Sequence, residues 1–137
     1  MIEPGMILYF APPMFSDGVT NIDKQKRLML VIEKNNYDNT LMLLNISKID
    51  GKPSCLTYKY NIAIRNFNPP LPVASFVKLN SNYKIDNFPK LSNYLYKNGV
   101  LLNDEELKNI KEKYNQYKFN SIVHRISITK EEFMSCN

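Results

Sequence analysis

The chain has 137 residues, 44% hydrophobic and 23% charged, which is enough for one domain with one core and too little for two. No apolar run approaches the ~20 residues needed to cross a bilayer. The first residues lack the basic and long apolar regions of a signal peptide. We therefore expect a single cytoplasmic domain over residues 1–137, without a membrane partner.

The net charge of +5 is unevenly distributed. Residues 1–102 hold twelve Lys and Arg against seven Asp and Glu, whereas residues 103–137 hold six of each. A basic excess on one part of a chain is typical of a protein that binds a polyanion. The fifteen lysines and eighteen asparagines equally fit a coding bias that raises the lysine count without functional demand. Charge alone therefore leaves nucleic-acid binding as one open interpretation.

Short strands are predicted in the first half of the chain. Residues 5–11 form an apolar strand that stops at Pro12-Pro13, and residues 12–24 form a long loop. A loop of this length in a compact domain usually has a function or is mobile. Residues 26–34 are apolar on both faces, which predicts a central strand, and a turn at 35–39 leads to its hairpin partner at 40–47.

Further strands are predicted downstream of this hairpin. In residues 55–64, Leu56, Tyr58, Tyr60 and Ile62 alternate with smaller or polar residues, which indicates a strand. Three prolines in 66–72 exclude an interior strand there, and 73–79 and 83–86 complete the series. Five or six short strands at this spacing are typical of a small barrel.

The pattern becomes helical toward the C-terminus. A short helix-like stretch begins at Phe88 and ends at Asn98-Gly99, a typical helix stop. Asn103 is expected to cap a longer helix. The apolar face of that helix is formed by Leu107, Ile110, Tyr114 and Tyr117.

The last twenty residues are less determined. Residues 119–128 suit either a strand or a continued helix, and Thr129 to Glu132 predict a capped final turn. If 119–128 is a strand, the only histidine, His124, shares a face with Ile122, Ile126 and Ile128. We therefore expect a packed histidine rather than a catalytic one. The two cysteines, Cys55 and Cys136, lack metal-ligand spacing and are expected to be free thiols.

The order of these segments resembles the MazF/PemK family of toxins. Pro4-Gly5-Met6 is similar to the family's Pro-Gly-Asp-like lead into its first strand. Arg27 followed by 28–32 is similar to its Arg before a Pro-Val-Val-Ile-Ile-like strand, and Ile46-Ser47 to an Ile-Thr at the end of the return strand. Ser75-Phe76-Val77 is similar to the family's Ser followed by three apolar residues, and residues 83–86 are similar to the Arg-Thr-Ile-Asp-like tetrad that comes after it.

The resemblance covers approximately residues 4–117. Leu28 replaces the family's Pro, and 21–26 replace its Gly-rich, acidic loop end. Residues 118–137 exceed the family's length and are expected to form a C-terminal extension. The Ser47-Lys48 pair is also similar to the Ser/Lys-containing loop of ToxN-type toxins, which share the fold and are controlled by RNA antitoxins.

The resemblance implies a fold, an activity and partners. The fold is mainly β with C-terminal helices, a small SH3-like barrel of the MazF/PemK/CcdB type. The activity is that of a toxin of a toxin–antitoxin system, an endoribonuclease that cleaves single-stranded RNA and needs no cofactor. The partners are the RNA substrate, a cognate antitoxin that is either a protein or a structured RNA, and a second copy in a homodimer.

Arg27 and Ser47 are the predicted catalytic residues. Cleavage without a metal requires the RNA 2′-oxygen to attack the adjacent phosphorus, which leaves a cyclic phosphate and a 5′-hydroxyl. A fixed guanidinium stabilises the negative charge that develops, and a hydroxyl can bind the same phosphate. Arg27 is one of only three arginines. The alternatives are a solvated strand-end cation and a turn-capping hydroxyl. The catalytic base is not identified.

Four lysines are expected to line an RNA groove near the same sheet end: Lys24, Lys26, Lys48 and Lys52. Each of them alone also fits a solvated side chain. Three aromatic residues, Tyr58, Tyr60 and Phe67, lie next to Lys59 and Arg65 in the sequence, an interleaving that suits base stacking or, alternatively, core or dimer packing. No metal site is predicted.

Two other functions stay open. The chain could be a non-catalytic toxin or binding module of the same fold, such as a gyrase poison or an RNA-binding barrel. It could also be an accessory protein that uses the barrel for protein–protein contact.

Overall fold

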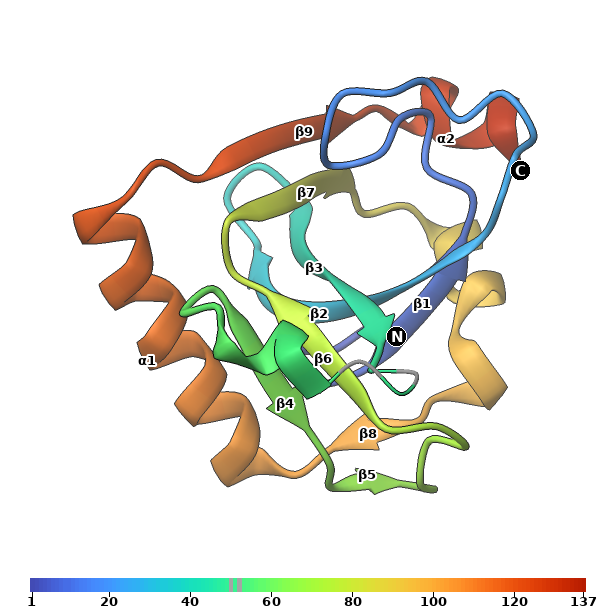
Figure 1. Ribbon diagram of the computed structural model, residues 1–137. Helices are drawn as coiled ribbons and strands as arrows, with labels where there is room; N and C mark the ends of the chain where they lie inside the picture. Colours follow the sequence, from blue (N-terminus) through green and yellow to red (C-terminus); the bar gives the residue numbers. More distant parts are fainter. Residues whose placement is uncertain (50, 52) are drawn as a thin grey trace.

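The computed structural model describes residues 1–49, 51 and 53–137, and the fold is mainly β with helices toward the C-terminus (Figure 1). Seven strands share one sheet: β1 (Ile7–Phe10), β2 (Arg27–Asn35), β3 (Thr40–Lys48), β4 (Asn61–Ile64), β6 (Ser75–Lys78), β7 (Ser81–Asp86) and β9 (His124–Ile128). Two short strands, β5 (Phe67–Asn68) and β8 (Leu101–Leu102), pair separately.

The sheet bends because β3 has two neighbours on the same edge. The strand order is β1-β2-β3-β6-β4, and all of these pairs are antiparallel. Residues 40–43 of β3 pair with β7, whereas residues 46–48 pair with β6. β9 then joins β7 in parallel. Among the described residues, β1 and β4 are not paired with each other, so the hydrogen bonding does not close the sheet.

The central strand β2 separates two cores, which explains why its sequence is apolar on both faces. Leu30 and Ile32 belong to one buried cluster with Ile110 and other residues of the helix α1 (Asp104–Asn120). Met29 and Val31 point to the other face and join a second cluster. The prediction of a central strand paired with a hairpin partner is therefore confirmed.

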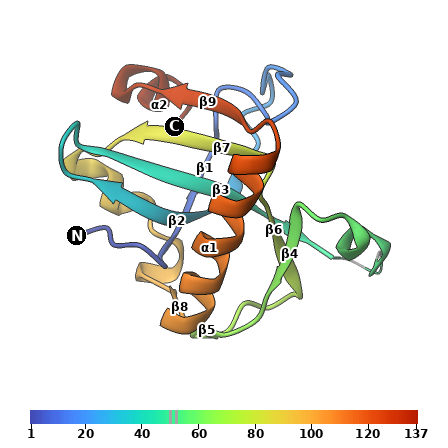
Figure 2. The same ribbon diagram turned by 90° about the vertical axis from the view of Figure 1, so that its left-hand side faces the viewer.

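The helix α1 crosses one side of the sheet (Figure 2). It begins where predicted, since Asn103 Oδ1 accepts hydrogen bonds from the backbone nitrogens of Glu105 and Glu106 at 3.0 and 3.2 Å. Before it, the short 3-10 helix η2 (Pro89–Tyr94) ends at the extended residue Leu95, and a second one, η3 (Tyr96–Asn98), ends at Gly99, whose φ of +113° is left-handed. This confirms the predicted stop.

Residues 118–137 are packed into the fold. They comprise the end of α1, the strand β9 and the helix α2 (Lys130–Cys136), which begins with the predicted capping box of Thr129 and Glu132. Phe133 of α2 is fully buried in the second cluster. The Asn137 side chain accepts a hydrogen bond from the backbone nitrogen of Ala11 and donates one to the Ala11 carbonyl.

The prediction of a strand over 55–64 is wrong for its first half. Pro53–Thr57 form the 3-10 helix η1 and a turn follows, so only Asn61–Ile64 are extended. The Asn61 side chain donates to the Cys55 carbonyl at 2.8 Å and holds the turn closed. The apparent alternation was misleading because Tyr58 is 55% exposed rather than directed into the core.

The expectation of a packed His124 is also wrong. β9 does form, but it lies outermost beside β7, and His124 at its first residue is exposed. Ile122 lies before the strand and is exposed as well, so only Ile128 of that predicted face is buried. Cys55 and Cys136 are free thiols. Within the described ranges, no helix is long and apolar enough to span a membrane.

Candidate active site

The hairpin of β2 and β3 brings Arg27 and Ser47 together. Leu28 pairs with Ile46, so the preceding residue of β2 and the following residue of β3 occupy neighbouring positions. Both line one cavity of about 560 Å³, together with Lys26 and Lys48. Four of the residues predicted from the sequence thus surround a single cavity.

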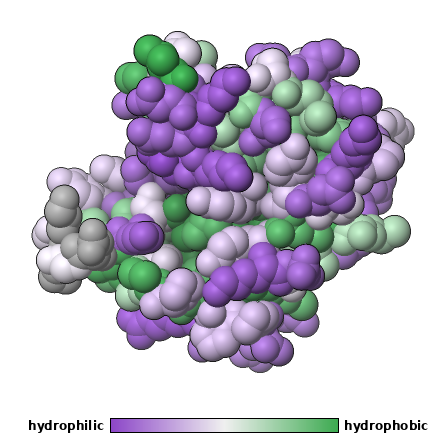
Figure 3. Space-filling view, turned by 90° about the vertical axis from the view of Figure 1, so that its right-hand side faces the viewer, coloured by the Kyte–Doolittle hydropathy of each residue, from purple (hydrophilic) through white to green (hydrophobic). Residues whose placement is uncertain are grey.

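Apart from Ser75, the rest of the described cavity wall is apolar and aromatic. Its apolar lining includes Leu28, Ile46, Leu71 and Val73. Tyr9 and Tyr96 also line it and make an edge-to-face contact with ring centroids 6.0 Å apart. Figure 3, which views this side of the molecule, shows hydrophobic side chains gathered in a hollowed band between hydrophilic regions. An apolar wall lowers the local dielectric constant and so strengthens the electrostatic interactions of the cations beside it.

The Arg27 guanidinium is oriented but not neutralised. Its Nη1 donates to the Lys26 carbonyl at 3.2 Å and its Nη2 to Gln25 Oε1 at 3.0 Å. Its Cζ lies 4.7 Å from the ring centroid of Phe15, a cation–π contact with the long loop. Among the described carboxylates none forms an ion pair with it. A half-buried guanidinium with spare donors is suited to bind an anion.

The Ser47 hydroxyl is held by one neighbour. Its Oγ accepts a hydrogen bond from Asn45 Nδ2 at 3.0 Å, two residues earlier on the same strand. An oxygen that accepts this bond keeps its own proton for donation to a ligand. Ser47 is half-buried on the cavity wall rather than capping a turn.

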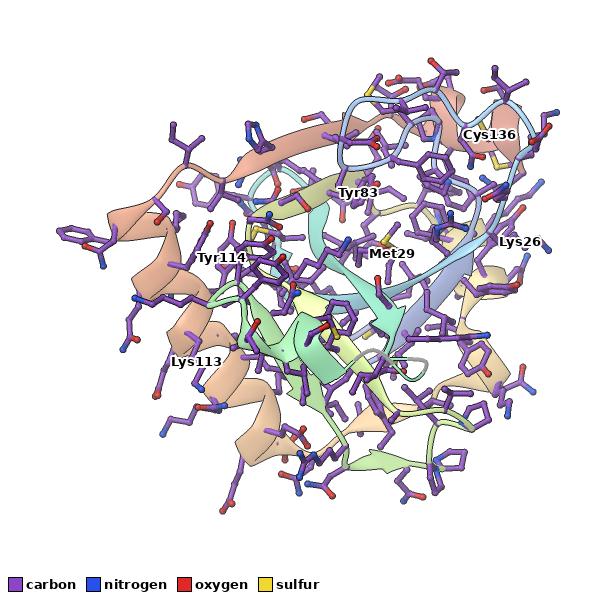
Figure 4. The ribbon with its side chains drawn as sticks, viewed as in Figure 1. Lys26, Met29, Tyr83, Lys113, Tyr114 and Cys136 are labelled. Atoms are coloured by element: carbon purple, nitrogen blue, oxygen red, sulfur yellow. The ribbon has the colours of Figure 1, made fainter. Side chains whose placement is uncertain are left out.

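The four predicted lysines separate into three groups. Lys26 and Lys48 are exposed and line the cavity, and Lys26 Nζ lies 5.6 Å from the ring centroid of Tyr9 (Figure 4). Lys24 is exposed in the loop before β2 and is not part of the cavity wall. Lys52 lies outside the described residues.

Tyr83 is a buried neighbour of the site that no pattern in the sequence indicates. It is 2% exposed, and its hydroxyl donates to the Met14 carbonyl at 3.2 Å, which ties the long loop to β7. Burial raises the pKa of Tyr83 to about 12, while the nearby Arg27 charge lowers this pKa and Asp17 raises it. The phenol therefore stays protonated at neutral pH and is not a general base.

Asn21 joins the two ends of the long loop. It is 5% exposed, and its Nδ2 donates to the carbonyls of Pro12 and Gln25 at 2.8 and 2.9 Å. Its Oδ1 accepts from the Gln25 nitrogen at 2.9 Å. The Gln25 side chain in turn accepts a hydrogen bond from the Arg27 guanidinium. Asn21 therefore helps to position Arg27 through Gln25. Asparagine in a loop is a general signal for such bonds, but the sequence does not show which backbone groups it meets.

The described cavity wall contains no histidine and no carboxylate. Among the described residues, no group of three or more His, Cys, Asp or Glu is arranged to hold a metal ion. The cavity offers cations, serine hydroxyls and aromatic surface, which can bind and polarise a phosphodiester.

Comparison with protein-family models gives no match, and neither does comparison with curated proteins. The resemblance to MazF/PemK toxins stays a prediction.

Proposed function

We propose that the chain is a toxin of a toxin–antitoxin system and acts as a metal-independent endoribonuclease on single-stranded RNA. The observation that supports this most directly is the shared cavity of Arg27 and Ser47. In it, an arginine without a partner among the described carboxylates lies beside a hydroxyl, two lysines and two exposed or half-buried tyrosines. Phosphate and base are the two parts of RNA that such a lining recognises.

In the proposed reaction, Arg27 and Ser47 bind the non-bridging oxygens of the scissile phosphate. The RNA 2′-oxygen attacks phosphorus while the bond from phosphorus to the 5′-oxygen breaks, which yields a 2′,3′-cyclic phosphate and a 5′-hydroxyl. Negative charge builds on the non-bridging oxygens, and the guanidinium stabilises it. Lys26 and Lys48 bind flanking phosphates. The described side chains supply charge stabilisation rather than proton transfer, which predicts slow turnover.

The finer fold and the partners belong to the same proposal. We propose that the bent sheet is a divergent member of the small SH3-like barrels of MazF/PemK toxins. The toxin would act in the cytoplasm as a homodimer and be neutralised by a protein or RNA antitoxin. The apolar residues of 40–47 carry no argument for the dimer, since Leu41, Leu43, Leu44 and Ile46 are buried within one chain.

The decisive experiment incubates purified protein with single-stranded RNA in EDTA and analyses the fragment ends. We expect cyclic phosphate and 5′-hydroxyl ends. Arg27→Ala is expected to lower the cleavage rate ~10²–10³-fold, because one preorganised donor to the developing charge is lost. Arg27→Lys keeps the charge but loses the planar fork and is expected to stay strongly impaired.

The matched control is Lys90→Ala, which removes one positive charge from an exposed position outside the cavity wall. It should cleave like the parent protein. A folded Arg27→Ala protein that cleaves at the parent rate would contradict the assignment of the site.

The absence of a histidine or carboxylate on the described cavity wall favours a second candidate function, a non-catalytic RNA-binding module. This candidate predicts RNA binding without fragments in the same experiment. A gyrase poison would leave the RNA intact and show no affinity for it.

A further inference from the structure

A second and larger hollow lies between α1 and the η1–β4 segment. Its volume is about 1070 Å³, and its walls come from residues 56–65 on one side and from α1 on the other. No residue of the cavity around Arg27 contributes to it. We call it the tyrosine groove, because Tyr58 and Tyr117 line it on opposite walls.

Tyr58, Tyr60 and Tyr117 form a series of ring contacts at the groove. The rings of Tyr58 and Tyr60 are nearly parallel, with an interplanar angle of 17° and centroids 5.3 Å apart. Tyr60 meets Tyr117 of α1 edge to face at 6.4 Å. Tyr58, at the outer end of this series, is 55% exposed. An exposed ring on a supported stack leaves a face for another planar group.

Cations surround the stack. Lys59, Arg65 and Lys113 line the groove, and Figure 4 shows Lys113 on the part of α1 next to β4. Glu106 is the only acidic residue in the described lining. Its carboxylate already accepts hydrogen bonds from the backbone nitrogens of Arg65 and Asn66 at 2.8 and 3.0 Å. The groove therefore has a net positive charge and complements a polyanion.

We propose that the tyrosine groove binds single-stranded RNA, with a base stacked on Tyr58 and the backbone phosphates held by Lys59, Arg65 and Lys113. Stacking on an aromatic ring beside cations is the general means of binding unpaired nucleotides. The inference rests on the proposed function in naming RNA, but it concerns binding and does not require cleavage.

The position of the groove suits an RNA that also occupies the cavity around Arg27. Ser47 of β3 lies opposite Phe76 of β6, which in turn lies opposite Ala63 of β4. Ser47 lines the cavity and Ala63 lines the groove. Two strand spacings amount to ~10 Å, so the walls of the two sites are a short distance apart along the sheet. One RNA strand longer than a few nucleotides can reach both.

The test measures the affinity of a 5′-fluorescein-labelled decauridylate by fluorescence anisotropy in EDTA. All proteins carry Arg27→Ala, so that cleavage does not interfere. Adding Tyr58→Ala is expected to weaken binding roughly 5- to 100-fold, through the loss of one stacked base. Tyr58→Phe keeps the ring and should retain the affinity. Lys113→Ala should weaken binding and reduce its salt dependence by about one phosphate contact.

The matched control is Tyr37→Ala, which removes another exposed tyrosine, from the turn between β2 and β3 and outside the groove. It should bind like the parent. Equal affinities for the Tyr58→Ala and Tyr37→Ala proteins would overturn the inference, and so would an absence of decauridylate binding. If Tyr58→Ala weakens binding but the protein with Arg27 intact releases no fragments from RNA in EDTA, the groove is supported and the proposed nuclease is refuted.

Discussion

Tyr83 illustrates how one side chain couples the core to the candidate site. Its ring belongs to the second buried cluster, while its hydroxyl binds the carbonyl of Met14 in the loop that also supplies Phe15 to Arg27. Burial disfavours the phenolate, which accounts for the pKa of about 12. The protonated hydroxyl thus anchors the loop over the whole physiological pH range.

This pKa predicts a pH-dependent stability. The pKa in the folded state lies above the ordinary value of 10.0. The contribution of Tyr83 to the free energy of unfolding is therefore fully present below pH 10 and is lost as the pH rises toward 12. The loss amounts to roughly 2–3 kcal/mol. The Tyr83→Phe protein has no phenol to ionise, so its stability lacks this dependence on pH. At pH 7 its free energy of unfolding is lower by about 1 kcal/mol, because the hydrogen bond is missing.

Urea unfolding of both proteins at several pH values between 7 and 12 measures the difference. Stability of the parent should fall relative to Tyr83→Phe above pH 10. A difference that stays constant over this range would contradict the assignment of the raised pKa to Tyr83.

The loop between β1 and β2 depends on Asn21 in a similar way. The buried side-chain amide of Asn21 donates two hydrogen bonds and accepts one, and these bonds join Pro12 to Gln25. Asn21→Ala leaves the Pro12 carbonyl in a buried position and the Gln25 backbone groups in partly buried positions without their partner, and is expected to cost about 1–3 kcal/mol. Since Gln25 holds the Arg27 guanidinium, RNA cleavage should fall as well. Asn36→Ala, at an exposed position in the β2–β3 turn, is the matched control.

Hydrogen exchange and cleavage assays on the two variants test this loop. Faster exchange confined to residues 12–26 in Asn21→Ala is the expected result. Unchanged exchange in this loop would show that it is held by other contacts.

The molecule as a whole depends on its last segment. Phe133 of α2 contacts Phe10, Phe88 and Tyr94, with ring centroids 4.9, 5.4 and 4.8 Å away. Phe133→Ala is expected to reduce the free energy of unfolding by about 3–5 kcal/mol, through lost burial and a cavity. Met134→Ala, at the neighbouring position that is 40% exposed, should cost much less. Thermal denaturation of both variants makes the comparison, and equal losses would mean that α2 does not complete the core.

Elements whose signals are local could be predicted from the sequence. The apolar run of β2, the hairpin that returns as β3, the Asn103 cap of α1 and the Thr129 capping box each depend on residues within a few positions of one another. The residues of the candidate site could be predicted from the sequence for the same reason. A hairpin register alone places Arg27 next to Ser47 and brings Lys26 and Lys48 to the same end.

Long-range contacts decided the rest. The alternation from Leu56 to Ile62 could not reveal η1, because the bond from Asn61 to Cys55 and the contact with α1 replace a strand partner there. His124 lies exposed because β9 pairs in parallel with β7 at the outside of the sheet. This pairing joins segments that are over forty residues apart in the sequence. The tyrosine groove exists only because α1 packs beside β4. Local propensity acts along the chain, whereas burial and pairing act between distant parts of it, so the walls of both cavities emerge only on folding.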